Sequence, residues 1–253
     1  MAETGHAKNI ANFGTLISFV QGYGSAYDPS NAAIELTALQ AKLAAANTSL
    51  DGVTTALAPW KTKVNDRETE FEGLRKLVTR VVNSYAASGA EKNSVDDAKA
   101  IKRKIDGARA KALPQDDPET PENEAQGNSV SQRSYTQTVE HFDNLIEFLT
   151  TNSSFYAPNE NELKLTTLTS KATAMKAANT AVMTAATPLS NARLDRDVEL
   201  YNETSGLVDT ALTVKKYVKS LYGADSPQFK QISGLEFRKV KTLKVNVTPP
   251  DED

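Results

Sequence analysis

A short charged motif occurs twice in the chain, and its residues are the first candidates for chemistry. It reads DRETE at residues 66–70 and DRDVE at residues 195–199. Neighbouring carboxylates can transfer protons in acid-base catalysis. On a helix, however, Glu70 and Glu199 follow an arginine by three residues and lie within reach of its guanidinium. We therefore expect two ion pairs, Arg67 with Glu70 and Arg196 with Glu199, that set helix register or contribute to an interaction surface.

The residues that most often bind metals or act as nucleophiles are scarce. The chain has no cysteine, and its two histidines are His6 and His141. A di-metal centre in a helical bundle needs Glu-x-x-His pairs on facing helices, and His141 directly follows Glu140 instead. Zinc-finger, P-loop and GxGxxG patterns are also missing from the sequence. We expect no catalytic residue, no metal and no cofactor, and we expect the chain not to be an enzyme.

The overall charge gives no electrostatic reason to bind nucleic acid. The 253 residues carry a formal net charge of -3, whereas binding to phosphates needs clustered Lys and Arg. The basic stretch from Lys99 to Lys111 lacks interleaved aromatic residues and is expected to form a solvated helix face. The first residues lack the basic and apolar regions of a secretion signal, and no apolar run approaches the roughly 20 residues of a membrane span. We expect a cytoplasmic protein without a membrane span.

The first half of the chain is repeated in the second half. A shift of 129 residues aligns 9–70 with 138–199 without a gap. Four extra residues in the second copy then bring Gly73-Leu74 onto Gly206-Leu207. A repeat of this length predicts an internal duplication. The matched positions are mostly apolar or turn residues, among them Phe13/Phe142, Leu16/Leu145, Ile17/Ile146, Tyr27/Tyr156, Pro29/Pro158, Leu36/Leu165, Leu39/Leu168 and Pro59/Pro188.

Within each copy the apolar residues have helical spacing. Steps of three and four place one apolar face on the first segment of each copy, and the same spacing continues from Leu36 to Tyr85. The fold class is therefore expected to be all-α, with two tandem and similar up-and-down helical bundles. The face-forming residues of the first segments are Ile10, Phe13, Ile17 and Val20 in one copy and Val139, Phe142, Ile146 and Leu149 in the other.

Two prolines interrupt the long helical patterns, Pro59 in the first copy and Pro188 in the second. A proline inside a helix costs about 3 kcal/mol, because it lacks an N–H group and clashes with the preceding turn. A chain reversal at each proline avoids this cost and is the favoured interpretation. The alternative is one long kinked helix, which the unbroken apolar phase supports.

The remaining segments define the expected domains. A further helix is predicted after Ser94, with acidic residues early and basic residues late. Residues 114–133 are rich in proline and acidic side chains, which predicts a linker. The domains are then bundle 1 at 1–113, the linker at 114–133 and bundle 2 at 134–253. Partial alternation near the C-terminus predicts either a short β-strand or an extended arm.

These features predict a non-enzymatic structural or interaction protein, such as a scaffold, an assembly subunit or an adaptor. A duplicated chain resembles a dimer and can present paired surfaces to a protein partner or to itself. One alternative is a membrane-active protein of the pore-forming type, in which the Ala- and Thr-rich residues 171–189 would enter lipid. Association with nucleic acid ranks third. Any small-molecule ligand is left open.

Overall fold

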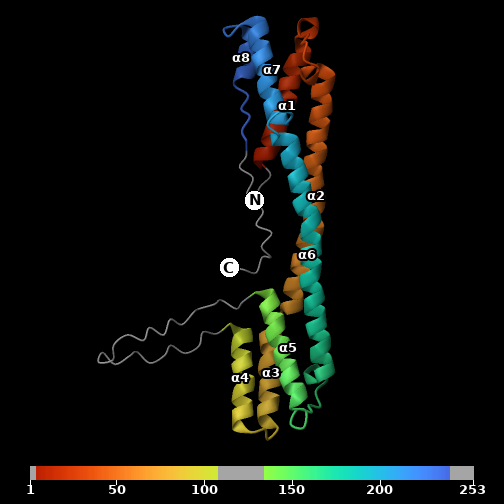
Figure 1. Cartoon of the computed structure of the whole chain (residues 1–253), viewed down its shortest axis with the longest axis vertical. Helices are drawn as coiled ribbons and strands as arrows, with labels where there is room; N and C mark the ends of the chain where they lie inside the picture. Colours follow the sequence, from red (N-terminus) through yellow and green to blue (C-terminus); the bar gives the residue numbers. More distant parts are fainter. Residues whose placement is uncertain (1–3, 108–133, 240–253) are drawn as a thin grey trace, which may run out of the picture. The chain divides into compact units, whose positions relative to one another are not determined.

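The structure is a computed structural model that describes residues 4–107 and 134–239. Over these two ranges the regular elements are helices and no strand occurs (Figure 1). The expected all-α class is confirmed. Short 3-10 turns at Ala32–Ile34 and Asn161–Leu163 precede the two long helices. The α-helices are α1 (Thr4–Gly22), α2 (Leu36–Phe71), α3 (Leu74–Ala87), α4 (Lys92–Asp106), α5 (Tyr135–Thr151), α6 (Leu165–Tyr201), α7 (Leu207–Tyr222) and α8 (Pro227–Ser233).

Pro59 and Pro188 lie inside single long helices, α2 of 36 residues and α6 of 37 residues. The prediction that the chain reverses at these prolines is wrong. Both prolines are exposed, so water can bind the carbonyl that loses its partner four residues earlier. The buried stripe of each helix has a seven-residue spacing, which Arg67 and Arg196 continue beyond the prolines. Its apolar members include Leu39, Ala46 and Val53 in α2 and Leu168, Met175, Val182 and Leu189 in α6.

The described chain divides into two compact units. Unit 1 contains the chain up to Lys61 and again from Ala185, and unit 2 contains Thr62–Thr184. The division expected from the sequence, 1–113 and 134–253, follows the two repeats instead. Each observed unit takes helices from both repeats, because α2 and α6 do not turn back at their prolines. The expected linker at 114–133 lies outside the described residues.

Unit 1 has its core between α1 and α7, with α8 packed on both. All four residues of the predicted apolar face of α1 are buried. They meet α7 residues such as Leu207 and Val214, and Ile232 of α8 joins the same cluster. Fully burying one such aliphatic or aromatic side chain contributes about 1.5–3 kcal/mol. Repeat 1 and repeat 2 therefore share one core in this unit.

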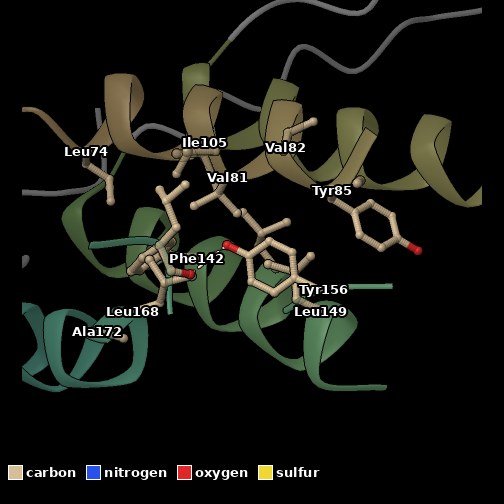
Figure 2. Close-up of a cluster of buried hydrophobic side chains, with 14 of the residues drawn as sticks. Leu74, Val81, Val82, Tyr85, Ile105, Phe142, Leu149, Tyr156, Leu168 and Ala172 are labelled. Carbon is tan, nitrogen blue, oxygen red and sulfur yellow. Dashed lines mark hydrogen bonds between the residues drawn. The ribbon is translucent and has the colours of Figure 1, made fainter. Parts of the chain in front are cut away.

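Unit 2 has the corresponding core, formed by α5 against α3 and α4 (Figure 2). Phe142 and Leu149 of α5 face Val81 and Tyr85 of α3 across this cluster, and all four are fully buried. The predicted spacing along α3 is confirmed, since Leu74, Val78, Val81 and Tyr85 are all buried. This core again combines the two repeats.

The predicted helix after Ser94 is present as α4 but begins at Lys92, so Ser94 lies in its first turn. Ser94 is not the N-cap; its Oγ lies 2.5 Å from the Tyr85 hydroxyl. The basic residues predicted late in this helix are in place, with Arg103 and Lys104 in the last turn. Gly107 ends the helix with a φ of 64°, a left-handed conformation that favours glycine.

After α8 the described chain runs to residue 239 without regular secondary structure. It is held on α1, because Asn9 Nδ2 donates to the Arg238 carbonyl at 2.8 Å and the Arg238 N–H donates to Asn9 Oδ1 at 3.1 Å. Asn12 adds a hydrogen bond to the Glu236 carbonyl at 2.7 Å. The rest of the expected C-terminal strand or arm, residues 240–253, lies outside the described residues.

Candidate interaction site

Arg67 is a buried cation in α2, within unit 2, and only 5% of its surface is exposed. Its guanidinium carbon lies 3.9 Å from the centroid of the Tyr135 ring. Phe71, one turn later in α2, meets the same ring edge-on at 4.8 Å. The Arg67 Nε has no hydrogen-bond partner among the described residues. A cation over an aromatic face gains about 0.5–2 kcal/mol, so the ring contributes the attraction that was expected from a carboxylate.

Glu70 is engaged by a lysine and not by Arg67. Its Oε1 accepts a hydrogen bond from Lys171 Nζ at 2.9 Å, and its backbone carbonyl accepts another from the same ammonium. Lys171 belongs to α6, so this pair joins the two long helices within unit 2. About a quarter of the lysine side chain and a third of the glutamate side chain are exposed, at 26% and 32%. Solvent screening therefore limits the contribution of the pair to about 1 kcal/mol or less.

Arg196 lies at the equivalent position of the second copy, in unit 1, and is also 5% exposed. Its Nε and Nη2 donate to the Asp197 Oδ1 at 3.0 and 2.7 Å. Glu199 accepts a hydrogen bond from Lys42 Nζ at 3.2 Å, which joins α6 to α2 within unit 1. The two equivalent arginines are therefore held differently, one by a ring and one by the carboxylate of the next residue.

The two lysine–glutamate pairs involve equivalent positions, with the roles of the two copies exchanged. Lys42 and Lys171 are separated by 129 residues, as are Glu70 and Glu199. The lysine of each copy thus pairs with the glutamate of the other copy. Neither lysine was predicted as a site residue. The presence of lysine at the same position of both copies could have indicated a shared role. Their partners could not be read from the sequence, because they are 157 and 101 residues away.

The histidines act as polar members of the packed helices. His6 Nδ1 lies 2.8 Å from the hydroxyl of Tyr201. His141 is buried, and burial lowers the pKa of its imidazole. The nearby Lys104 lowers that pKa further, whereas Glu140 raises it. Among the described residues no cluster of three or more His, Cys, Asp or Glu side chains could hold a metal ion.

The equivalent tyrosines of the two copies make the same contact. The Tyr27 hydroxyl donates to the Ile34 carbonyl and the Tyr156 hydroxyl to the Leu163 carbonyl, each at 2.7 Å. Burial raises the pKa of Tyr27, with a smaller contribution from Tyr217. Burial and then Glu160 raise the pKa of Tyr156 to about 12. Both hydroxyls therefore stay protonated donors that close the turn before a long helix.

A pocket of about 370 Å³ lies in unit 2 beside the start of α3. Its lining combines apolar and aromatic side chains with Arg75 and Lys76. These two side chains are exposed and form no ion pair in the described part of the chain. The lining includes no histidine or carboxylate, the usual general bases. The other lining residues are Phe71, Gly73, Leu74, Ile105, Tyr135 and Thr138.

Three of the four charged residues predicted in the repeated motifs contact another helix: Arg67 contacts Tyr135 of α5, Glu70 contacts Lys171 of α6, and Glu199 contacts Lys42 of α2. The fourth, Arg196, contacts Asp197, the next residue of the same helix. Comparison with protein-family models, with curated proteins and with solved structures finds no match for this chain.

Proposed function

We propose that this chain is a non-enzymatic interaction protein, built by duplication of one helical bundle, that works as a scaffold, assembly subunit or adaptor. The duplication is supported by contacts that recur at equivalent positions of the two copies. They include the tyrosine–carbonyl bonds and the lysine–glutamate pairs. A chain that has doubled one bundle presents its surfaces in pairs, as a dimer does.

The observation that carries the proposal is an apolar surface on α6 in unit 1. Leu194 and Val198 are 59% and 64% exposed, and they lie one turn apart on the same helix face. The equivalent residues of the first copy are Asn65 and Thr69, which are polar. A duplicated helix that keeps its buried stripe but gains exposed apolar residues on one copy is suited to bind another protein surface.

A membrane-active role is the first alternative. It would require the Ala- and Thr-rich residues 171–189 to leave α6, where Ala172, Met175 and Val182 are buried. None of the described helices combines the length and the apolar content that a membrane crossing requires. No contact in the described part of the chain favours this alternative.

Binding to nucleic acid is the second alternative, and it depends on the basic helix α4. Lys99 and Lys102 of this helix pair with Asp96 and Asp106 on the same helix. Each pair reduces the charge that these lysines could offer to a phosphate. The proposal of an interaction protein is therefore preferred.

Sedimentation velocity over a wide range of protein concentration tests whether the chain is an assembly subunit. We expect the wild-type chain to self-associate through Leu194 and Val198. Replacing both with aspartate should weaken association at least tenfold, a loss of about 1.4 kcal/mol or more. The matched control carries Asn65→Asp and Thr69→Asp, which adds the same charges to the equivalent face of α2 and should leave association unchanged. A chain that stays monomeric throughout the range would contradict a role as an assembly subunit.

A further inference from the structure

The two repeats complete each other's cores. In unit 1 the buried face of α1 belongs to repeat 1, and the α7 residues that cover it, such as Val214 and Val218, belong to repeat 2. In unit 2 the buried face of α5 belongs to repeat 2, and the α3 residues that cover it, such as Val78 and Val81, belong to repeat 1. A half chain alone would therefore leave the apolar faces of both α1 and α3, or of both α5 and α7, uncovered.

The lysine–glutamate contacts between the repeats are reciprocal as well. Lys42 of repeat 1 pairs with Glu199 of repeat 2, and Lys171 of repeat 2 pairs with Glu70 of repeat 1. The equivalent tyrosines Tyr27 and Tyr156 each meet a ring of the other repeat, but those two rings are not at equivalent positions. Tyr27 meets Tyr217 of α7 at a centroid distance of 5.2 Å, and Tyr156 meets Tyr85 of α3 at 6.4 Å.

This reciprocity is the contact pattern of an isologous dimer, in which residue i of one subunit meets residue j of the other and j meets i. Here both subunits are parts of one chain. Because both repeats belong to one chain, each half is tethered near the other, which raises their effective concentration. Closure within a chain is therefore favoured at low concentration. The contacts themselves, however, do not require the two repeats to belong to the same chain.

We propose that the surfaces by which the repeats cover each other can accept the complementary repeat of a second copy of this chain. Repeat 1 of one chain then pairs with repeat 2 of another, and the reverse pair closes a dimer in which halves are exchanged. This inference rests on the proposed role in assembly and adds a second mode of association, which does not use the exposed Leu194 and Val198. The contacts that form in the exchanged dimer are those of the single chain, including both lysine–glutamate pairs.

Reciprocal charge reversal, in full chains that are folded before they are cleaved, tests the exchange. One variant carries Lys171→Glu and the other carries Glu70→Lys, and each also has a site-specific protease sequence in place of residues 118–124. Each parent then has two like charges where unit 2 normally has an ion pair. One variant is uniformly labelled with nitrogen-15, both are cleaved after folding, and the two are mixed and examined by native mass spectrometry. A second sample of the mixture is unfolded in urea and refolded.

We expect every cleaved chain to remain a one-to-one complex of its halves. On mixing, exchanged complexes should form, because both products regain opposite charges in unit 2. One product has the wild-type pair of Glu70 and Lys171, and the other combines both substitutions and has the same pair with its charges reversed. Exchanged complexes should exceed parental ones by about two- to tenfold after refolding. The control mixes labelled and unlabelled wild-type protein with the same cleavage site, which should reach only the statistical share.

Separation of the cleaved halves into two folded monomers would overturn the inference, and so would refolded complexes that show no bias towards the exchanged products. If the uncleaved chain self-associates through Leu194 and Val198 but cleaved halves from different chains do not recombine, the exchange is overturned. The proposed function then remains in place.

Discussion

Arg67 and Arg196 occupy equivalent positions and are equally buried, yet they have different partners. Arg67 has the Tyr135 ring, and its Nε is without a hydrogen bond among the described residues. Arg196 has the Asp197 carboxylate at 2.7 Å, with side chains that are 6% and 19% exposed. A buried cation without a full set of hydrogen bonds costs folding free energy, whereas removing one member of a buried ion pair leaves the other uncompensated. The same substitution should therefore act oppositely at the two positions.

Replacing Arg67 with methionine should leave the thermal melting temperature unchanged or raise it. Methionine fills the same stripe of α2 and removes the desolvated guanidinium. Arg196→Met is the matched comparison and should lower stability by about 1–3 kcal/mol, because Asp197 loses its partner. Thermal melts of the two variants in the same buffer give the measurement. Equal destabilisation by both substitutions would mean that the ring holds Arg67 as strongly as the carboxylate holds Arg196.

At the scale of the helix, the sequence predicts buried faces better than chain direction. The spacing of Ile10, Phe13, Ile17 and Val20 identifies the buried face of α1, because helical periodicity depends only on neighbours along the chain. The effect of Pro59 was misjudged because it depends on whether the affected carbonyl faces water. That exposure is a property of the folded unit. Lys42 and Lys171 were overlooked because each has its partner on the other long helix.

Replacing Pro59 with alanine should stabilise the protein. Within α2 the substitution restores a backbone N–H donor and removes the ring clash, a gain of up to about 3 kcal/mol. Pro158→Ala is the control, and we expect it to lower the stability of the protein. Pro158 lies in the irregular segment before α6, where losing a rigid residue should cost about 0.4–1 kcal/mol. Urea unfolding gives both values. A loss of stability in Pro59→Ala would indicate that unit 1 or unit 2 needs a bend that the proline imposes.

At the scale of the whole molecule, duplication itself hides which helices pair. Val81 of α3 and Val214 of α7 occupy equivalent positions, since they share the offset that aligns Gly73 with Gly206. The apolar face of α1 could therefore pack equally well on α3 of its own repeat or on α7 of the other repeat, as far as the sequence indicates. Periodicity and composition are nearly the same for the two choices. The sequence indicates two cores, but the pairing of α1 with α7 and of α5 with α3 is visible only in the fold.

Hydrogen exchange in two matched core variants distinguishes these pairings. Val81 and Val214 are both fully buried, and truncation to alanine should cost on the order of 2 kcal/mol at either position, or roughly 30-fold in local opening. Because Val214 belongs to the core of unit 1, Val214→Ala should speed amide exchange in α1, α7 and α8. Val81→Ala should instead speed exchange in α3, α4 and α5. If Val81→Ala loosens α1 together with α3 and α4 while α5 keeps its protection, each repeat forms its own core and the shared cores are refuted. Faster exchange in α5 but not in α1 is the outcome that the reciprocal contacts require.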